Sequence, residues 1–421
     1  MKSKKEYEKE LSVMSGVPCN EEDIKDPQTI MMRLEETKLF KTSNPIFEDG
    51  TIKAVVNYLG KDYAVTVRPD GYSIPEAYRV EHMFTQSDIK ALNSQGVCLV
   101  VEMMFSDDFL NSYHLQIKIL HVLMPEMVAV FDESSEKILS GRWVKMAAES
   151  EIPPAPSYIY TVQAVIGEED DARVWLHTHG LNRCGLTELE DMEANKDNYN
   201  SHYNVIHTYA DRAIEEPEIL DEKKPVFLAR LSEEVFLVVT RVNWEEVIDN
   251  YPDDYLGTGD DRKEGHNKNT SLVYAYANPD DCEKGIYSAI SIYDELLEDN
   301  PLYMLTNAET RRMSALARER ISYFEKAITH EGSTLLAKIA LKTDKEFEEY
   351  SNFEHIWFEI KNIGNGKLSG VLTQDPYYIK GIEAGYEGEY SYNNVTDWVI
   401  FCGEERITPD TAYLIDIMGE E

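Results

Sequence analysis

The sequence has 421 residues, of which 43% are hydrophobic and 28% are charged, values that are ordinary for a folded globular protein. At roughly 100–200 residues per domain, this length predicts two or three domains. The 78 acidic side chains exceed the 41 basic ones by 37, and a net charge of −37 disfavours binding to nucleic acids and to anionic membrane surfaces. The same charge favours basic proteins, polyamines and cations as partners.

The sequence shows no signal for export or membrane insertion. Its N-terminus is charged, and no apolar stretch of the roughly 7–15 residues found in secretory signals follows it. The most apolar segments, 97–105 and 115–130, are too short or too interrupted for a membrane span of about 20 residues. The five cysteines lie far apart and include no Cys-x-x-Cys pair, which excludes ribbon-type zinc sites. We therefore expect a cytoplasmic protein.

Residues 1–150 alternate between helical and strand patterns. In chain order, the predicted elements are a helix at 26–37, a β-hairpin formed by 52–59 and 62–68, a helix at 87–94, a strand at 97–105, a helix at 107–123 and a strand at 127–131. The hairpin follows from period-two alternation on either side of Gly60 and Lys61, and Ser87 is the expected N-cap of the second helix. Interleaved helices and strands predict a core built on one mixed sheet.

Residues 151–342 begin at a proline-rich break and form a second region, which is either a separate domain or continuous with the first. The predicted elements are strands at 158–167 and 172–178, a helix at 199–216, a hairpin at 225–242, an exposed loop at 251–269, a strand at 271–277 and helices at 286–298 and 308–330. The last helix is long and amphipathic, with an apolar face that includes Leu316 and Phe324.

Residues 343–421 return to a β pattern. Short strands are predicted at 356–362, 367–372, 388–392 and 395–402, with Gly and Asn between them. About 75 residues with several short strands suit a small barrel or roll. The expected fold class is therefore α+β, with a large mixed-sheet N-terminal region, in one or two domains, and a small β-rich, barrel- or roll-like C-terminal domain.

Four segments near the C-terminus carry a family resemblance. They are Glu354-His-Ile-Trp-Phe-Glu-Ile, Gly370-Val-Leu-x-x-Asp-Pro, Lys380-Gly-Ile-x-x-Gly and Asp397-Trp. In this order and spacing they resemble the YegJ-like family, a bacterial domain of unknown function, over roughly the last 75 residues. The upstream segments Trp175-Leu-His-Thr-His-Gly-Leu and Glu188-Leu-Glu look like the N-terminal region that accompanies this domain in uncharacterised bacterial proteins. The resemblance implies a domain layout and supplies no catalytic residues.

The same motifs contain the first set of candidate ligand-binding residues, Asp375, Lys380, Asp397 and Trp398. A structural interpretation makes Asp375 a turn former ahead of proline, Trp398 a core residue and Asp397 a hydrogen-bond acceptor or cap. In the functional alternative, these side chains converge on a ligand groove.

His177-Thr-His179-Gly180 is the sharpest pattern in the chain. Residues two apart on a strand share a face, so both imidazoles would point the same way. Paired imidazoles suit Zn²⁺, Ni²⁺ or Fe²⁺, and a third protein ligand with a bound water would support hydrolysis. Glu188 is the preferred third ligand. The other candidates are Glu190, His202 and His207.

Several observations favour a structural role for these histidines instead. His202 and His207 are five residues apart, about 140° around a helix, so they cannot easily bind one ion. Neither a His-Glu-x-x-His motif nor a cysteine-rich partner set occurs. In this alternative, His177 and His179 hydrogen-bond to backbone or carboxylate groups at a strand end. A thiolate–imidazole pair that uses Cys184 is a further alternative.

These observations favour a non-catalytic binding or interaction module that needs no cofactor and uses its acidic field to capture a basic protein. One concrete version is an immunity-like protein that masks a basic toxin. The alternative is a metal-dependent hydrolase that uses His177 and His179 with zinc or another divalent transition metal. A third alternative is a structural protein whose acidity serves solubility.

Overall fold

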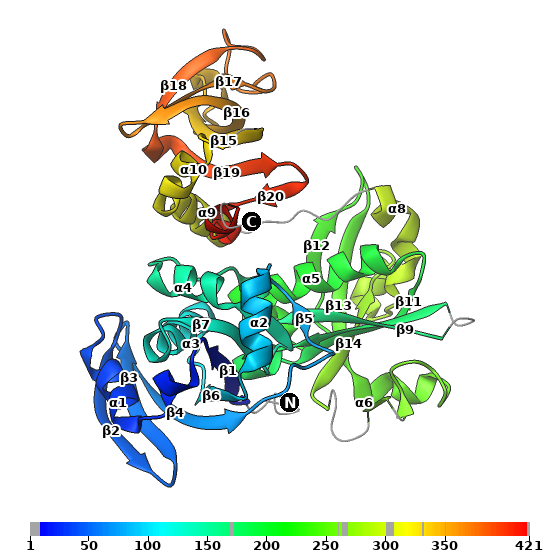
Figure 1. The fold of residues 1–421 in the computed structure, drawn as a ribbon. Helices are drawn as coiled ribbons and strands as arrows, with labels where there is room; N and C mark the ends of the chain where they lie inside the picture. Colours follow the sequence, from blue (N-terminus) through cyan, green and yellow to red (C-terminus); the bar gives the residue numbers. More distant parts are fainter. Residues whose placement is uncertain are drawn as a thin grey trace. The chain divides into compact units, whose positions relative to one another are not determined.

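The computed structural model describes residues 9–168, 172–259, 261–262, 268–299, 307–330, 332–349 and 351–418. The chain forms two compact units, Met1–Val144 with Pro156–Met304 and Lys145–Ala155 with Leu305–Glu421 (Figure 1). Both contain helices and sheets, which confirms the expected α+β class. Part of the loop predicted at 251–269, namely 260 and 263–267, lies outside the described residues.

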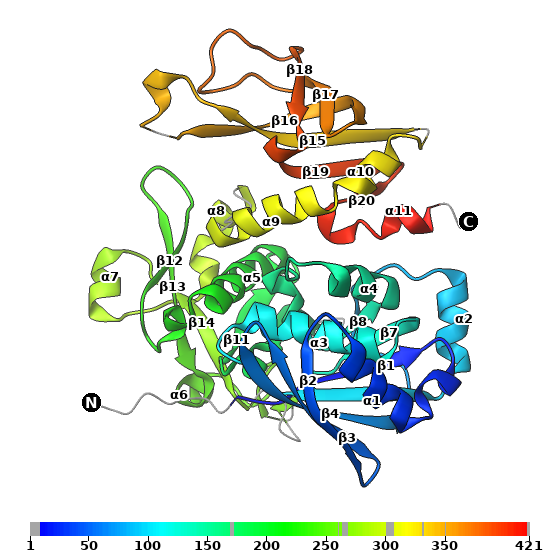
Figure 2. The same cartoon turned by 90° about the vertical axis from the view of Figure 1, so that its left-hand side faces the viewer.

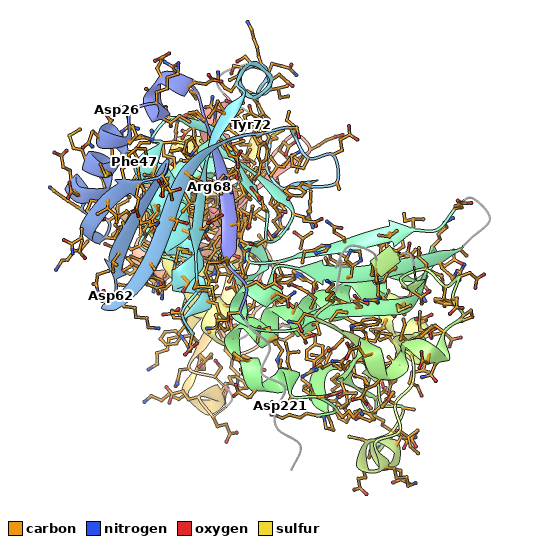
Figure 3. All side chains as sticks on the ribbon, turned by 90° about the horizontal axis from the view of Figure 1, so that it is seen from below. Asp26, Phe47, Asp62, Arg68, Tyr72 and Asp221 are labelled. Atoms are coloured by element: carbon orange, nitrogen blue, oxygen red, sulfur yellow. The ribbon has the colours of Figure 1, made fainter. Side chains whose placement is uncertain are left out.

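An eight-stranded sheet dominates the N-terminal half of the first unit, in the order β2-β3-β4-β6-β1-β7-β8-β5. Its strands are β1 (Ser12–Pro18), β2 (Lys41–Glu48), β3 (Thr51–Tyr58), β4 (Lys61–Gly71), β5 (Arg79–Val80), β6 (Val97–Met103), β7 (Met127–Asp132) and β8 (Lys137–Ser140). Only β5 and β8 pair in parallel, so the sheet is mixed as predicted. The predicted hairpin is the β3–β4 pair, and Gly60 has the left-handed φ of +80° that its tight turn favours. Figure 3 shows Arg68 midway along β4 and Asp62 near its start.

Helices cover both faces of this first sheet. The helices that begin before residue 150 are α1 (Pro27–Glu36), α2 (Gln86–Ser94), α3 (Phe109–Leu123) and α4 (Gly141–Glu149). Helix α3 is buried along most of its length, and α2 places Leu92 in a separate apolar cluster with Val100. The N-cap of α2 is Thr85, two residues before the predicted Ser87, because Thr85 and Asp88 form a reciprocal capping box.

A second sheet of six strands completes the first unit, in the order β12-β13-β14-β11-β10-β9. Its strands are β9 (Thr161–Ile166), β10 (Arg173–His179), β11 (Glu188–Asn195), β12 (Val226–Arg230), β13 (Phe236–Asn243) and β14 (Thr270–Ala275). The accompanying helices are α5 (Tyr199–Glu215), α6 (Trp244–Val247), α7 (Pro279–Lys284) and α8 (Asp294–Asp299). β11 and β14 are parallel, so this sheet is mixed as well.

Alternation along β10 assigns each face of the second sheet to different neighbours. Val174 and Leu176 join an apolar cluster with Tyr203 of α5. Trp175, on the other face, packs with Trp244 of α6 and with aromatic residues of the segment 251–256. Because side chains two apart share a face, His177 and His179 lie on the Trp175 side of the sheet.

The second unit contains a six-stranded antiparallel sheet in the order β18-β17-β16-β15-β19-β20. Its strands are β15 (Ser333–Lys342), β16 (Phe353–Gly364), β17 (Lys367–Leu372), β18 (Glu387–Ser391), β19 (Val395–Cys402) and β20 (Glu405–Ile407). Figure 2 shows α9 (Asn307–Glu319) and α10 (Ile321–Ala327) along one face of this sheet. This arrangement confirms the β-rich C-terminal part, and the expected boundary at residue 343 falls between β15 and β16.

The long helix predicted at 308–330 is divided in the structure. Helix α9 ends at Glu319 and α10 begins at Ile321, and Arg320 between them is buried with its guanidinium donating to the Pro409 carbonyl at 2.7 Å. A short helix, α11 (Leu414–Ile417), follows β20. Among the helices of the described ranges, none has the length and apolar character needed to cross a bilayer.

Candidate functional site

A row of three aromatic side chains on β10 ends at the candidate site. Trp175, His177 and His179 occupy alternate positions on the strand, and their rings touch in sequence. The ring centroids of Trp175 and His177 are 4.1 Å apart, and those of His177 and His179 are 4.8 Å apart in an edge-to-face arrangement. His177 in the middle is buried, whereas His179 lies at the strand end, where a cavity opens.

This cavity has a volume of about 300 Å³ and is lined mainly by polar side chains. Its walls come from the segment before β1, the β7–β8 turn, the end of β10 with the turn that follows it, and the segment before β14. The lining residues are Glu10, Leu11, Glu133, Ser134, Glu136, His179, Gly180, Asn182, Arg183, Glu188, Lys268 and Asn269. Four of these side chains are glutamates, and we call this space the glutamate cavity.

Glu188 forms the buried part of the cavity wall. Its carboxylate accepts hydrogen bonds from the Thr178 hydroxyl at 2.6 Å and from the backbone N–H groups of Gly180 and Asn182 at 2.9 and 3.0 Å. Burial raises the pKa of Glu188 to about 7, although these hydrogen bonds act to lower it. The carboxyl group therefore holds the turn after β10 in place through three hydrogen bonds.

Glu136 and His179 form the more open part of the wall. The Glu136 Oε1 lies 3.8 Å from the His179 Nε2, and the Gln163 amide donates to Glu136 Oε2 at 2.5 Å. Gln163 lies on β9 directly opposite His177. The second sheet therefore positions a carboxylate that the β7–β8 turn of the first sheet supplies.

Arg183 lines the buried side of the cavity and joins the two sheets of the first unit. Its guanidinium donates to both carboxylate oxygens of Asp132, at 2.9 and 3.0 Å, to the Ser12 hydroxyl at 3.1 Å, and to the carbonyl of Ile159. The side chains of Arg183 and Asp132 are fully inaccessible. Burial alone would lower the pKa of Arg183, but Asp132 outweighs burial and raises it. Asp132 thus neutralises this cation in the cavity wall.

The candidate metal ligands have other partners in the structure. Glu188 accepts the hydrogen bonds described above, Glu190 pairs with Arg262, His202 pairs with Asp191 and Asp294, and His207 accepts from or donates to the Tyr160 hydroxyl. Across the described part of the chain, no group of three or more His, Cys, Asp and Glu side chains is arranged to hold a metal ion. Of the preferred trio, His179 and Glu188 line the same cavity and His177 does not.

We therefore expect little bound transition metal. A stable zinc site needs three or four protein ligands in one place. Protein purified without chelators and without a polyhistidine tag should contain far less than one equivalent of zinc, iron or nickel by plasma mass spectrometry. Close to one equivalent, lost in a His177→Ala, His179→Ala double variant, would contradict this prediction.

The C-terminal candidate residues lie in different settings. Asp375 accepts from the Ala384 N–H at 2.8 Å, and Lys380 donates its N–H to Asp344 at 2.8 Å and pairs with Glu346 through its ammonium. Both belong to the connection between β17 and β18, and the strands β16 and β15 lie between β17 and β19 in the sheet.

Asp397 and Trp398 are neighbours on β19 and point to opposite faces. Trp398 is fully buried, donates to the Ala317 carbonyl at 2.9 Å and packs on Phe324, so it is a core residue. Asp397 lies opposite Lys338 of β15, and burial raises its pKa to about 6.

Comparison with known families matches three regions of the chain. Residues 12–154 match "Protein of unknown function (DUF4026) N-terminal", and 162–274 match "Protein of unknown function (DUF4026) C-terminal". Residues 307–421 match "Uncharacterized protein conserved in bacteria (DUF2314)". No curated protein and no solved structure matches. Except for Glu10 and Leu11, the residues of the glutamate cavity come from the two DUF4026 regions together.

Proposed function

We propose that this protein is a non-catalytic binding module that captures an ammonium group of a basic partner in the glutamate cavity. The chain joins both DUF4026 regions to a DUF2314 region, and all three regions are of unknown function. The observation that carries this proposal is the convergence of Glu10, Glu133, Glu136 and Glu188 on one cavity. Two cations also line the cavity: Arg183, which pairs with Asp132, and Lys268.

The size and charge of the cavity support an ammonium ligand. A volume of about 300 Å³ lies at the small end of the range of known ligand pockets, and accommodates one side-chain-sized group. An ammonium group is a compact charge with three donors, which suits carboxylates that approach from several walls. The net charge of −37 would in addition draw a basic partner toward the protein.

Titration with 1,5-diaminopentane, a mimic of a lysine side chain, tests this function. We expect saturable binding by calorimetry at low salt, and a Glu136→Gln substitution should weaken binding about tenfold or more. A hydrogen bond to a charged group contributes about 1.5–3 kcal/mol, and about 1.4 kcal/mol corresponds to a factor of ten. Binding should also weaken as the Debye length falls from about 30 Å at 0.01 M salt to about 10 Å at 0.1 M.

The matched control is Glu76→Gln, which removes the same charge from an exposed position that does not line the cavity. Equal affinities of the Glu136→Gln and Glu76→Gln variants would show that the diamine senses only the overall charge. That result, or no binding at low salt, would refute the proposed function.

The finer expectations from the sequence accompany this function as proposals. We propose that the protein acts in the cytoplasm, that the partner is a basic protein of the kind an immunity-like protein masks, and that the C-terminal domain is YegJ-like. The support for the first is the wide scatter of the five cysteines, which leaves one unpaired in any disulfide scheme. The support for the second is the strong acidic charge, and the support for the third is the order of motifs between Glu354 and Trp398.

A further inference from the structure

A second cation in the first unit is held in a way that resembles ligand recognition. The side chain of Arg262 is 6% exposed, and the carboxylate it meets, Glu190 of β11, is fully buried. Its two terminal nitrogens donate to the two oxygens of Glu190, at 3.1 and 2.5 Å, and its Nε donates to the Gly257 carbonyl at 2.7 Å. The guanidinium thus makes a two-pronged pair with one carboxylate.

Two tryptophans complete the surroundings of this guanidinium. Its central carbon lies 4.6 Å from the ring centroid of Trp244 and 5.4 Å from that of Trp175. Aromatic rings beside the charge together with a two-pronged carboxylate form the arrangement that distinguishes guanidinium from ammonium. We call the space bounded by Trp175, Trp244 and Glu190 the tryptophan slot.

The walls of the slot and its occupant come from different kinds of structure. Trp175 lies on β10, Glu190 on β11 and Trp244 on α6, so regular elements hold all three walls. Arg262 instead follows the segment 248–259, which has no strand or α-helix. Gly257 lets this segment pass the slot, because its φ of +88° favours glycine and a side chain there would start 3.0 Å from the Trp175 ring.

We infer that the tryptophan slot is a recognition site for arginine side chains, which Arg262 fills as an internal ligand and which an arginine of another molecule occupies when Arg262 withdraws. The slot is separate from the glutamate cavity, since none of its three walls lines that cavity. The inference therefore does not depend on the proposed function. A purely structural ion pair would give the same geometry but no site for an outside ligand.

Removal of the internal arginine distinguishes these two explanations. In an Arg262→Ala variant, ethylguanidinium should bind saturably and change the fluorescence of the tryptophans. Wild-type protein should need at least tenfold more ethylguanidinium, because a tethered side chain competes at an effective concentration in about the millimolar range. Ethylammonium should bind the variant at least tenfold more weakly than ethylguanidinium, since it cannot form the two-pronged pair.

The control is the double variant Arg262→Ala, Glu190→Gln, which keeps the vacated space and removes the carboxylate. Equal responses of single and double variants, or of the single variant and wild type, would overturn the inference. If Arg262→Ala fails to fold, Arg262→Lys serves instead. Ethylguanidinium should displace the substituted side chain from the slot at a concentration at least tenfold below the concentration needed to displace Arg262 in wild-type protein. Ethylguanidinium should bind the Arg262→Ala variant equally well when Glu136→Gln is added. That result would show that the ligand binds in the tryptophan slot and not in the glutamate cavity.

Discussion

Substitution of Arg183 by methionine should lower the free energy of unfolding of the first unit by about 3–5 kcal/mol, because it leaves Asp132 buried without its counter-ion. Both side chains are fully inaccessible, and Arg183 reaches Ser12 of β1 and the Ile159 carbonyl as well as Asp132. The loss therefore affects the contact between the two sheets of this unit. Urea unfolding at pH 7, followed by tryptophan fluorescence and circular dichroism, measures it.

The double variant Arg183→Met, Asp132→Asn is the matched control. Removal of both charges of a buried pair is often close to neutral, whereas removal of one is strongly destabilising. The double variant should therefore be more stable than Arg183→Met alone, even though the Ser135 hydroxyl loses part of its bond to Asp132. A double variant less stable than the single one would show that the ion pair does not explain the loss.

The parts of the fold that the sequence predicted correctly have local causes. The β3–β4 hairpin follows from period-two alternation around Gly60, and α1 from Asp26, whose side chain accepts from the N–H groups of Gln28 and Thr29, ahead of a proline at the first helical position. Strand β1 was not predicted, because Ser12–Pro18 contains Ser, Gly and Pro and no alternation. It is a central strand because β6 and β7 pair with its two edges.

Strand β11 shows why tertiary contacts override composition. Glu188–Asn195 is rich in acidic residues and gives no apolar signal, yet most of it is buried. Each of its three buried carboxylates has a bonding partner that lies outside the strand. Glu188 binds the turn after β10, Glu190 binds Arg262, and Asp191 binds His202. None of these partners can be identified from local periodicity.

The candidate site was predictable only in part for the same reason. The spacing of His177 and His179 placed both imidazoles on one face, and Glu188 was named as a neighbour. Glu136 and Arg183 were missed, because Glu136 comes from the other sheet and the partner of Arg183 is 51 residues away. The net charge of −37 was the signal that did indicate the class of ligand proposed for the cavity.

Substitution of His202 by alanine should produce the second large loss, about 3–5 kcal/mol at pH 6.5, because Asp191 is buried and would lose its charged partner. The His202 ring is fully inaccessible, with Nδ1 2.5 Å from Asp191 Oδ2 and Nε2 2.8 Å from Asp294 Oδ1. Carboxylates face both nitrogens, so both nitrogens must carry protons to donate. Burial alone would lower the pKa of His202, but the bonds to Asp191 and Asp294 outweigh burial and raise it.

The raised pKa fixes how this loss depends on pH. The folded state holds the His202 proton more tightly than the unfolded state, whose histidine pKa is about 6.5. The stabilisation is therefore fully present below about pH 6.5 and is lost as pH rises through the higher folded pKa. Urea unfolding at a series of pH values measures the difference in the free energy of unfolding between wild type and His202→Ala. This difference should narrow from pH 6.5 to pH 9. His207→Ala is the matched control on the same helix. Because burial lowers the pKa of His207, the difference in the free energy of unfolding between wild type and His207→Ala should not narrow over this range. A constant or widening gap for His202→Ala would mean that the ring is neutral in the folded protein.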